Sequence, residues 1–353
     1  MTDFSRAVEL ARRRGGPAHL RILHRGRLEV DERIRVGPEA SFWPFSVSKI
    51  AIATLVWALH EDGALDVDEP VAAYWPEFAR AGKQGITIRD VLRHRSGLPR
   101  VGGTLAEVAA MADWGRATDR IARAAPRPGA AEAPAYEWLA WGFILGEAAQ
   151  RAAGRALPGL LRERILDPIG AEGTFLGLPA EERWRAVPFI GRDPGSAAVA
   201  AVLNRRRVRE AVIPAGGVST RAGDLARLLE ALRGGGAAIG LSAGSVRAMR
   251  EPSNDGEFDR FAGSRVWWGN GVQLGHPGSG PLGASALGRR SSPSTFGHNG
   301  SNVSIAWTDP ERELTFVYLS AIVEPFPVNR LRLMAIEDAA FEAVDGAGRG
   351  AHG

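Results

Sequence analysis

Strand patterns near both ends of the chain, with helical patterns between them, are the feature that most constrains the fold. Residues 19–35 read as two strands around a turn at Arg25 and Gly26. Further strands are expected late in the chain, at 267–274, 302–308 and 313–321. Helical spacing predicts helices at 3–14, 46–60, 66–74, 87–93, 104–122, 136–153, 156–164, 222–232 and 328–344. Strands from the two termini should therefore form one sheet, with a helical region inserted between them.

The 353 residues are expected to form a single domain made of two parts. The sheet part takes residues 1–65 and 235–353, and the helical part takes residues 66–234. No internal repeat or low-complexity tract is present in the sequence. The loop at 276–294 is rich in glycine, proline and serine, so we predict that it forms a mobile flap over a site.

Composition excludes several classes of protein. Hydrophobic residues make up 45% of the chain and charged residues 24%, as in an ordinary globular protein rather than a disordered one. The formal charge is only +4, and the two basic runs, Arg12 to Arg14 and Arg205 to Arg207, are typical of solvated faces. No nucleic-acid partner is therefore expected. The absence of cysteine excludes disulfides, thiolate zinc sites and a cysteine nucleophile.

The N-terminal sequence and the histidines add two further expectations. The N-terminus carries acids and three consecutive arginines, and it has no apolar run of signal-peptide length. No segment of about twenty apolar residues occurs elsewhere, so a cytoplasmic location without a membrane partner is expected. The histidines outside the stretch at 296–300 show no ligand spacing with nearby carboxylates, so no metal site is expected.

A lysine on a buried helix raises the main chemical question. From Ser46 to His60 nearly every position is apolar, and Gly63 follows where a helix would end. Lys49 lies in this stretch, and it is one of only two lysines in a chain that otherwise uses arginine. A lysine amine can be made neutral by burial, whereas a guanidinium stays charged. Lys49 is therefore a candidate for a group that must lose its proton.

Ser46 lies three residues before Lys49, which places both side chains on one face of the helix. A serine hydroxyl needs a base to become a nucleophile, and a lysine acting near pH 7 needs a pKa lowered by roughly three units. Burial in an apolar helix can supply much of this shift. By itself, however, the Ser-x-x-Lys spacing fits equally well a helix-capping serine followed by a lysine whose amine reaches solvent.

Three further stretches accompany this one, in a characteristic order. They are GITIRDVLRHRSGLPR at 85–100, PGAAEAPAYEWLAWGFILGEAAQRAAG at 128–154 and FGHNGSNVSIAWTDPERELTFVYLS at 296–320. Together with FSVSK, and with IPAGGVSTRAGDLARLL at 213–229, they resemble the serine hydrolases related to class C β-lactamases, D-Ala-D-Ala carboxypeptidases and family VIII esterases. The resemblance implies an α+β sandwich of the β-lactamase/transpeptidase type, in which helices flank an antiparallel sheet.

The resemblance also implies roles for individual residues. Ser46 would be the nucleophile and Lys49 its partner, and the phenol of Tyr136 would shuttle the proton. Lysine and tyrosine would form one coupled system, so the base is not assigned to either member. His298 begins the third motif of the family. The remaining roles are an oxyanion hole formed by the backbone N–H groups of Ser46 and Ser301, and substrate contacts by Trp138, Asn299 and Gly300.

One departure from the family pattern narrows the expected substrate. Family β-lactamases and carboxypeptidases carry Tyr-x-Asn, whereas this chain reads Tyr136, Glu137, Trp138. The missing asparagine argues against antibiotic hydrolysis, and a tryptophan would add an apolar wall that suits an acyl group. Other tryptophans could also line an acyl pocket, although core packing explains each one as well: Trp43, Trp114, Trp141, Trp267 and Trp268.

The chain is therefore predicted to be a cytoplasmic serine hydrolase that cleaves a small-molecule ester through an acyl-Ser46 intermediate and needs no cofactor. One alternative is a transacylase that passes the acyl group to an alcohol or amine in a biosynthetic pathway. A second alternative is amide hydrolysis, as a D-Ala-D-Ala carboxypeptidase or a weak β-lactamase. A third is a sensor that binds acyl groups or penicillin without catalysis.

Overall fold

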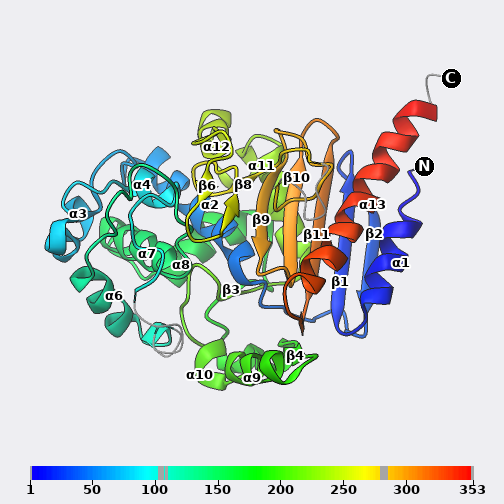
Figure 1. Cartoon of the computed structure of the whole chain (residues 1–353), viewed down its shortest axis with the longest axis horizontal. Coiled ribbons are helices and arrows are strands. Elements are labelled where there is room, and N and C mark those ends of the chain that lie inside the picture. Colours follow the sequence, from blue (N-terminus) through cyan, green and yellow to red (C-terminus); the bar gives the residue numbers. More distant parts are fainter. Residues whose placement is uncertain (1, 102–106, 108–109, 279–284, 351–353) are drawn as a thin grey trace.

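The computed structural model describes residues 2–101, 107, 110–278 and 285–350 (Figure 1). No helix within these ranges is long and apolar enough to cross a membrane. The flap predicted at 276–294 includes residues 279–284, which lie outside the described residues. The same holds for the start of the helix predicted at 104–122, of which the structure describes α6, Trp114–Arg123.

A six-stranded antiparallel sheet joins the two ends of the chain, which confirms the expected fold class. Its strands lie in the order β2, β1, β11, β10, β9, β8. Strand β1 pairs with β11 from Ala18 opposite Ser320 to His24 opposite Leu314. The strand bounds are β1 Ala18–His24, β2 Arg27–Ile34, β8 Gln273–Leu274, β9 Phe296–Gly300, β10 Ser304–Asp309 and β11 Leu314–Ser320.

The strand expected at 267–274 is wrong over most of its length. Only β8 joins the sheet, and the residues before it fold back, since Trp268 bridges to Gln273 and the N–H of Gly269 donates to Val272. Gly271 has a φ of +104°, a conformation that side chains other than glycine rarely adopt. The glycines of this stretch therefore make a tight turn where periodicity alone suggested a continuous strand.

Two terminal helices cover the outer face of the sheet. They are α1 (Ser5–Arg14) and α13 (Val328–Gly350), which lie side by side across β1 and its neighbours (Figure 1). Alternation along the strands sends Phe316 and Tyr318 toward these helices, while Val317 faces the other side. Trp307 of β10 stacks on Phe341 of α13 with ring centroids 4.3 Å apart.

The inner face of the sheet packs against α11 (Ala222–Arg233) and against α2 (Ser48–Glu61). Twelve residues of α2 are buried, because this helix lies between the sheet and the helical part and has no solvent side. Helix α11 contacts β1, β10 and β11, although its sequence falls within the range 66–234 assigned to the helical part. The contacts of α11 thus place it with the sheet layer, and the two-part division otherwise stays a prediction.

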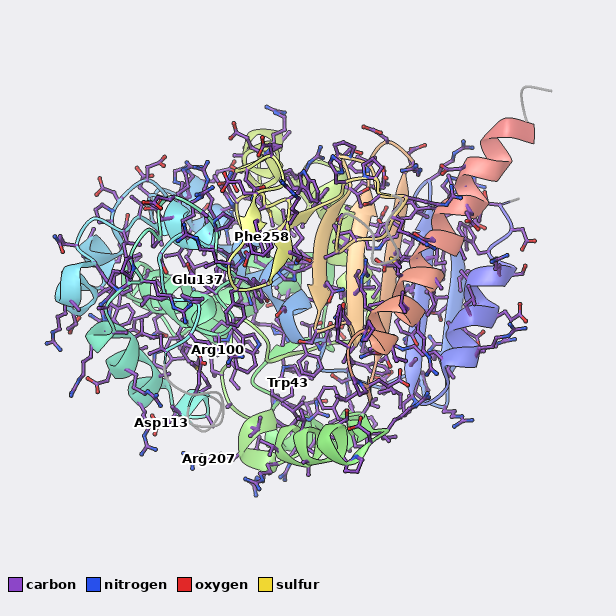
Figure 2. All side chains as sticks on the ribbon, viewed as in Figure 1. Trp43, Arg100, Asp113, Glu137, Arg207 and Phe258 are labelled. Carbon is purple, nitrogen blue, oxygen red and sulfur yellow. The ribbon has the colours of Figure 1, made fainter. Side chains whose placement is uncertain are left out.

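Apart from α9, α10 and α11, the helices of the helical part lie at the far end of the molecule from α13 (Figure 1). Figure 2 shows Glu137 among its elements, and Arg207 at the outer edge of the molecule next to α10. Helices α9, α10 and α12 were not expected from the sequence. The described helices outside the sheet layer are α3 Val71–Tyr74, α4 Ile88–Leu92, α6 Trp114–Arg123, α7 Ala140–Ala153, α8 Leu157–Leu161, α9 Pro194–Leu203, α10 Arg206–Arg209 and α12 Ala243–Arg250.

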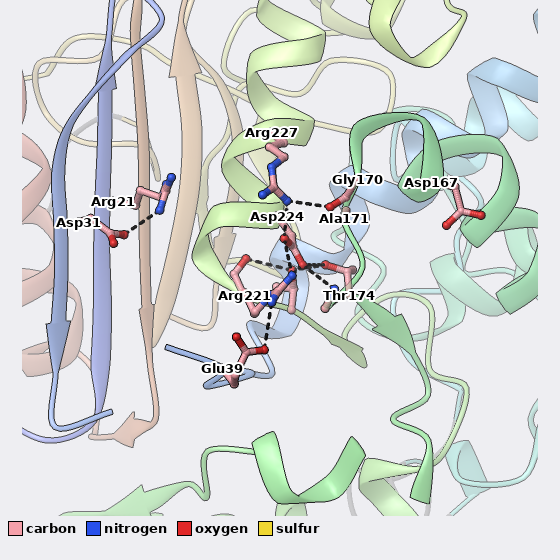
Figure 3. Close-up of polar contacts among 12 residues, drawn as sticks. Arg21, Asp31, Glu39, Asp167, Gly170, Ala171, Thr174, Arg221, Asp224 and Arg227 are labelled. Carbon is pink, nitrogen blue, oxygen red and sulfur yellow. Dashed lines mark hydrogen bonds and ion pairs between the residues drawn. The ribbon is translucent and has the colours of Figure 1, made fainter. Parts of the chain in front are cut away.

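A buried carboxylate fastens the start of α11 to the neighbouring loop. Asp224, only 2% exposed, accepts the N–H of Gly173 at 2.9 Å and the hydroxyl of Thr174 at 3.3 Å (Figure 3). It also pairs with Arg221 and Arg227, at 3.2 and 2.8 Å. Because several donors surround the carboxylate oxygens, the free-energy cost of burying Asp224 is offset. These contacts also hold in place the antiparallel pair formed by β3 (Phe175–Leu176) and β5 (Val218–Ser219).

Candidate active site

Ser46 lies in a tight turn that leads into the buried helix. A 3₁₀ turn, Phe45–Val47, joins directly to α2, and Phe45 has a φ of +54°, a strained value for a residue with a side chain. Strand β9 passes close to this turn, since a Cβ on Gly300 would lie 2.0 Å from the carbonyl oxygen of Pro44. Glycine is therefore required at position 300 for the strand edge to approach Ser46.

Lys49 is the second residue of α2, about one turn after Ser46, and has no solvent exposure. Three oxygens surround its amine. Lys49 Nζ lies 3.0 Å from Tyr136 Oη, 2.8 Å from the carbonyl oxygen of Trp138 and 3.3 Å from that of Ala215. The rings of Tyr136 and Trp141 also lie within 4.8 and 5.5 Å of Nζ. The amine therefore reaches no solvent, which rules out the reading of Lys49 as a surface-reaching lysine.

Burial controls the charge of Lys49. Removal from water lowers the pKa of the Lys49 amine well below its ordinary value, and only the negative charge of Glu137 acts in the opposite direction. A lowered pKa makes the neutral amine available at a pH where ordinary lysines are protonated. Lys49 is thus suited to receive a proton.

Tyr136 connects the lysine to the serine. Its phenol oxygen lies 2.5 Å from Ser46 Oγ, and its ring stacks on Trp268 at a centroid distance of 5.5 Å and an interplanar angle of 4°. The backbone N–H of Tyr136 donates to both carboxylate oxygens of Asp259 at 2.9 Å. Burial raises the pKa of the Tyr136 phenol, so the resting enzyme favours the neutral phenol over the phenolate.

Together these contacts form a proton path from Ser46 to Lys49. A neutral amine has two N–H bonds, and the carbonyl oxygens of Trp138 and Ala215 can accept both of them. Its lone pair then faces Tyr136 Oη, and hydroxyl hydrogens rotate freely. In this state Ser46 can pass its proton to Tyr136 while Tyr136 passes its own to Lys49, so that no free phenolate is needed.

Glu137 and His94 are buried next to the catalytic residues. Glu137 is fully buried; one carboxylate oxygen accepts the N–H of Ser96 at 2.8 Å, and the other has no partner among the described residues. Burial raises the pKa of Glu137 to about 8. The backbone N–H of Glu137 donates to His94 Nδ1 at 3.1 Å, and the His94 ring contacts Tyr136 at 4.9 Å and Trp268 at 4.2 Å. Burial lowers the pKa of His94 well below its usual value, so the ring stays neutral.

His298 lies on β9 at the other side of the tyrosine. Its ring centroid is 6.1 Å from that of Tyr136, and Nδ1 donates to the carbonyl oxygen of Asn299 at 2.8 Å. Burial lowers the pKa of His298 to about 3, so the ring is neutral. Because a carbonyl only accepts, the proton must be on Nδ1, which leaves Nε2 as a buried acceptor without a partner in the described residues.

The other β9 residues have contacts that bear on their predicted roles. Asn299 accepts the N–H of Asn302 at 2.8 Å and donates to the side chain of Asn302 at 3.1 Å, so it holds the turn after β9. Direct substrate contact by Asn299 stays a prediction that this geometry does not favour. Ser301 follows in that turn with a φ of +53°. Ser301 directly follows Gly300, and β9 contacts the turn that carries Ser46, but the oxyanion hole with Ser46 stays a prediction.

An apolar pocket opens beside Ser46. Among its described lining residues, Ser46 alone carries a hydroxyl, amide or ionisable side chain, and Trp138 forms one wall as predicted. Leu203 of α9 and Val208 of α10 also line it. The other lining residues are Trp43, Phe45, Met111, Leu139, Ile213, Ala215 and Gly216. Of the other tryptophans considered, Trp43 lines the pocket, Trp268 packs on Tyr136, and Trp141 packs near Lys49.

Sequence reasoning missed several supporting residues. Asp259, which holds the backbone of Tyr136, lies 123 positions away and looks like an ordinary turn aspartate. Ala215, which offers an oxygen to Lys49, acts through its backbone and carries no sequence signal. His94 lies within the stretch at 85–100 and carried a weak signal through the family resemblance. No group of three or more potential metal ligands occurs within the described ranges.

Comparison with known proteins gives consistent matches. A family model described as Beta-lactamase matches residues 9–341. The chain is 29% identical over 306 residues to the esterase/beta-lactamase LipL of Mycobacterium tuberculosis, which covers 77% of this chain and 67% of that protein. It is 32% identical over 286 residues to penicillin-binding protein 4 of Amycolatopsis lactamdurans, covering 75% and 70%. A solved family VIII carboxylesterase superposes with a TM-score of 0.80 at 25% identity, over 96% of this chain and 97% of that one.

Proposed function

The chain belongs to the beta-lactamase family, and from that premise we propose that it is a serine hydrolase that cleaves esters through a covalent acyl-Ser46 intermediate. The observation that carries the proposal is the continuous path from Ser46 Oγ through Tyr136 Oη to Lys49 Nζ, with distances of 2.5 and 3.0 Å. The serine end of this path lies in an apolar pocket that can hold an acyl group.

The first half-reaction forms the acyl-enzyme. Ser46 Oγ attacks the ester carbonyl carbon while its proton moves to Tyr136 and the proton of Tyr136 moves to Lys49. The N–H groups of Ser46 and Ser301 would stabilise the oxyanion of the tetrahedral intermediate. Collapse of this intermediate breaks the bond to the alkoxide, which takes the proton back through Tyr136 and leaves as the alcohol. The neutral acceptor His298 Nε2, which has no partner among the described residues, would receive a hydrogen bond from the leaving hydroxyl.

The second half-reaction releases the acyl group. Water gives a proton to the same path and attacks the acyl carbon, and Ser46 leaves with that proton. Each side chain returns to its starting protonation state, so no cofactor takes part. An alcohol or amine in place of water would give transacylation by the same steps.

An ester is favoured over an amide as the substrate. Trp138 stands where the family asparagine would bind an amide side chain, and its ring forms a wall of the apolar pocket. The esterase/beta-lactamase and the family VIII carboxylesterase among the similar proteins support this choice. Because a penicillin-binding protein is also among the similar proteins, peptidase, β-lactamase or sensor activity is the second candidate function. A cytoplasmic location and a small-molecule substrate stay predictions.

Intact-protein mass spectrometry tests the proposal directly. Wild-type protein and Ser46→Ala would each be mixed with p-nitrophenyl acetate, p-nitrophenyl butyrate, a penicillin and a fluorophosphonate. We expect rapid ester turnover and a fluorophosphonate adduct in the wild type, neither in Ser46→Ala, and little penicillin turnover. A long-lived penicilloyl adduct without ester turnover would favour the peptidase or sensor. Turnover in Ser46→Ala would remove Ser46 from the mechanism.

A further inference from the structure

Helix α9, Pro194–Leu203, exposes an apolar surface. Its sequence, PGSAAVAAVL, contains no charged residue, and only Ser196 and Ala200 are buried. Val199 is 50% exposed. The neighbouring strand β4 (Ile190–Gly191), which packs against α9, adds Ile190 at 44% exposure. An apolar helix would normally bury its side chains, so the exposure of α9 marks a surface that can meet another apolar phase.

A cluster of arginines follows α9 directly. Arg205, Arg206 and Arg207 are all exposed, and Arg207 lies at the outer edge of the molecule (Figure 2). Arg206 bonds to Glu210 at 2.9 Å, whereas Arg205 and Arg207 form no ion pair with any residue that the structure describes. Two uncompensated cations therefore stand next to the apolar face of α9.

The same segment reaches the catalytic pocket from the inside. Leu203, the last residue of α9, and Val208 of α10 line the apolar pocket that contains Ser46. Arg206 and Arg207 line a separate open hollow on the surface, together with Ala112, Glu210 and Ala211. Since Met111 lines the pocket and Ala112 lines the hollow, the two lie next to each other. The exposed surface and the nucleophile pocket thus share one wall.

We propose that α9 and the cluster Arg205 to Arg207 dock on an anionic lipid surface, from which lipid esters enter the pocket at Ser46. Apolar side chains beside arginines match the acyl region and the headgroups of such a surface. A second copy of the chain fits less well, because a two-fold contact through this face would bring the arginine clusters together. The inference of lipid esters as substrates rests on the proposed ester hydrolysis, whereas docking does not.

This inference departs from the expectation that the chain has no membrane partner. In the sequence, the run Arg205 to Arg207 is typical of a solvated face, and nothing there marks the apolar stretch before it as an exposed helix. The structure places both features on one surface, and their combination carries the inference.

Vesicle flotation with the full chain tests the docking. The probes are vesicles of phosphatidylcholine alone and of phosphatidylcholine mixed with phosphatidylglycerol. We expect binding to the mixed vesicles only, weakened by added salt. Arg205→Ser with Arg207→Ser should lower the partition coefficient about 30-fold, and Val199→Glu should lower it at least about tenfold.

Matched controls lie outside α9, β4 and the cluster Arg205 to Arg207. Leu28→Glu on β2 changes a side chain of 48% exposure, and Arg6→Ser with Arg27→Ser removes two exposed arginines from α1 and β2. Both variants should bind vesicles as the wild type does. Failure of the wild type to bind the mixed vesicles, or equal losses in the controls, would overturn the proposal. So would a concentration-dependent dimer in sedimentation that Val199→Glu disrupts, in the absence of vesicle binding.

Activity measurements separate this inference from the proposed function. Val199→Glu should turn over soluble p-nitrophenyl butyrate at the wild-type rate and an emulsified long-chain ester at least about tenfold more slowly. Equal turnover of the emulsified ester would overturn delivery of substrate from lipid. Vesicle binding without any ester turnover would support docking and contradict the hydrolase assignment alone.

Discussion

Lys49 Nζ lies 3.0 Å from Tyr136 Oη, and this single contact distinguishes the two lysines of the chain. Lys83 is also buried, and its amine also meets three oxygens, but all of them are backbone carbonyls, of Arg80, Ala122 and Ala124. Burial lowers the pKa of Lys83 to about 8. Burial and rarity therefore do not define the catalytic lysine, since both lysines share them; the contact with the phenol next to Ser46 does.

Replacing Lys49 should remove most of the activity, whether the new side chain is charged or neutral. Lys49→Arg keeps a cation that cannot lose its proton, and Lys49→Met keeps the apolar volume without an amine. We expect kcat to fall about a hundredfold to ten-thousandfold in both variants, because proton transfer is lost. Steady-state kinetics with p-nitrophenyl butyrate would measure this effect.

Lys83→Met is the matched control for these variants. It removes the amine donor from one buried and two part-buried carbonyl groups, so the free energy of unfolding should fall by about 1 to 3 kcal/mol while kcat is unchanged. Thermal unfolding of all three variants would separate loss of stability from loss of chemistry. An active Lys49→Arg enzyme would contradict the proton path.

Removing the phenol oxygen should interrupt the path between serine and lysine. Tyr136→Phe keeps the ring that stacks on Trp268 and the backbone N–H that Asp259 accepts, so the thermal midpoint should change little. The kcat should fall about a hundredfold or more, because Ser46 and Lys49 then have no group between them. The rate of fluorophosphonate labelling should fall in parallel. Labelling at the wild-type rate would show that Ser46 is activated without Tyr136.

The sequence predicts that Ser46, Lys49 and Tyr136 lie together, because each belongs to a short motif that resembles a motif of the family. The sheet from both termini could be anticipated from the strand patterns, since β10 and β11, which are buried on both faces, carry short runs of apolar and β-branched residues. Asp259 could not, because a buried aspartate that accepts backbone N–H groups looks like any turn residue in sequence. Nor could α9, since an apolar run predicts burial and this helix is exposed.

Glu137→Gln should change how stability depends on pH. The pKa of Glu137 is raised to about 8 from 4.5, so its neutral carboxyl stabilises the fold fully below pH 4.5, and this contribution is lost as pH rises to about 8. The amide keeps an acceptor for the N–H of Ser96 and does not titrate. The thermal midpoint of the wild type minus that of Glu137→Gln should therefore fall by a few degrees across this pH range and then stay constant. A fall of this size corresponds to a loss of several kcal/mol at most in the free energy of unfolding.

The same variant should alter the pH dependence of activity. Above pH 8 the wild-type carboxylate is charged and favours protonated Lys49, while His94 stays neutral and Asp259 is the same in both enzymes. The ratio of kcat/KM for Glu137→Gln to that of the wild type should rise as pH passes about 8. Parallel pH profiles would show that Glu137 only packs, because a merely structural role does not move a pKa.

Gly142 allows α7 to approach the backbone that holds Lys49. A Cβ at this position would lie 2.3 Å from the backbone nitrogen of Ala215, whose carbonyl oxygen accepts from Lys49. Gly142→Ala should therefore lower the free energy of unfolding by about 1 to 3 kcal/mol and also reduce kcat. Gly159→Ala on α8 is the control, because a Cβ there meets nothing within 4 Å and should stabilise the helix slightly. Equal thermal midpoints for the two variants would contradict the close approach.

Gly216 offers a way to test which part of the substrate the apolar pocket holds. The residue lines this pocket, its φ is not positive, and a Cβ would meet nothing nearer than a Leu139 methyl group at 3.7 Å, so Gly216→Ala and Gly216→Val should fold. The added methyl groups take up space that an acyl chain would occupy. The ratio of kcat/KM for p-nitrophenyl butyrate to that for the acetate should fall about tenfold in Gly216→Val, since misfit of even one methylene in an apolar pocket is worth roughly that factor. An equal fall for both esters would mean that the acyl chain binds elsewhere, and that the pocket receives the alcohol instead.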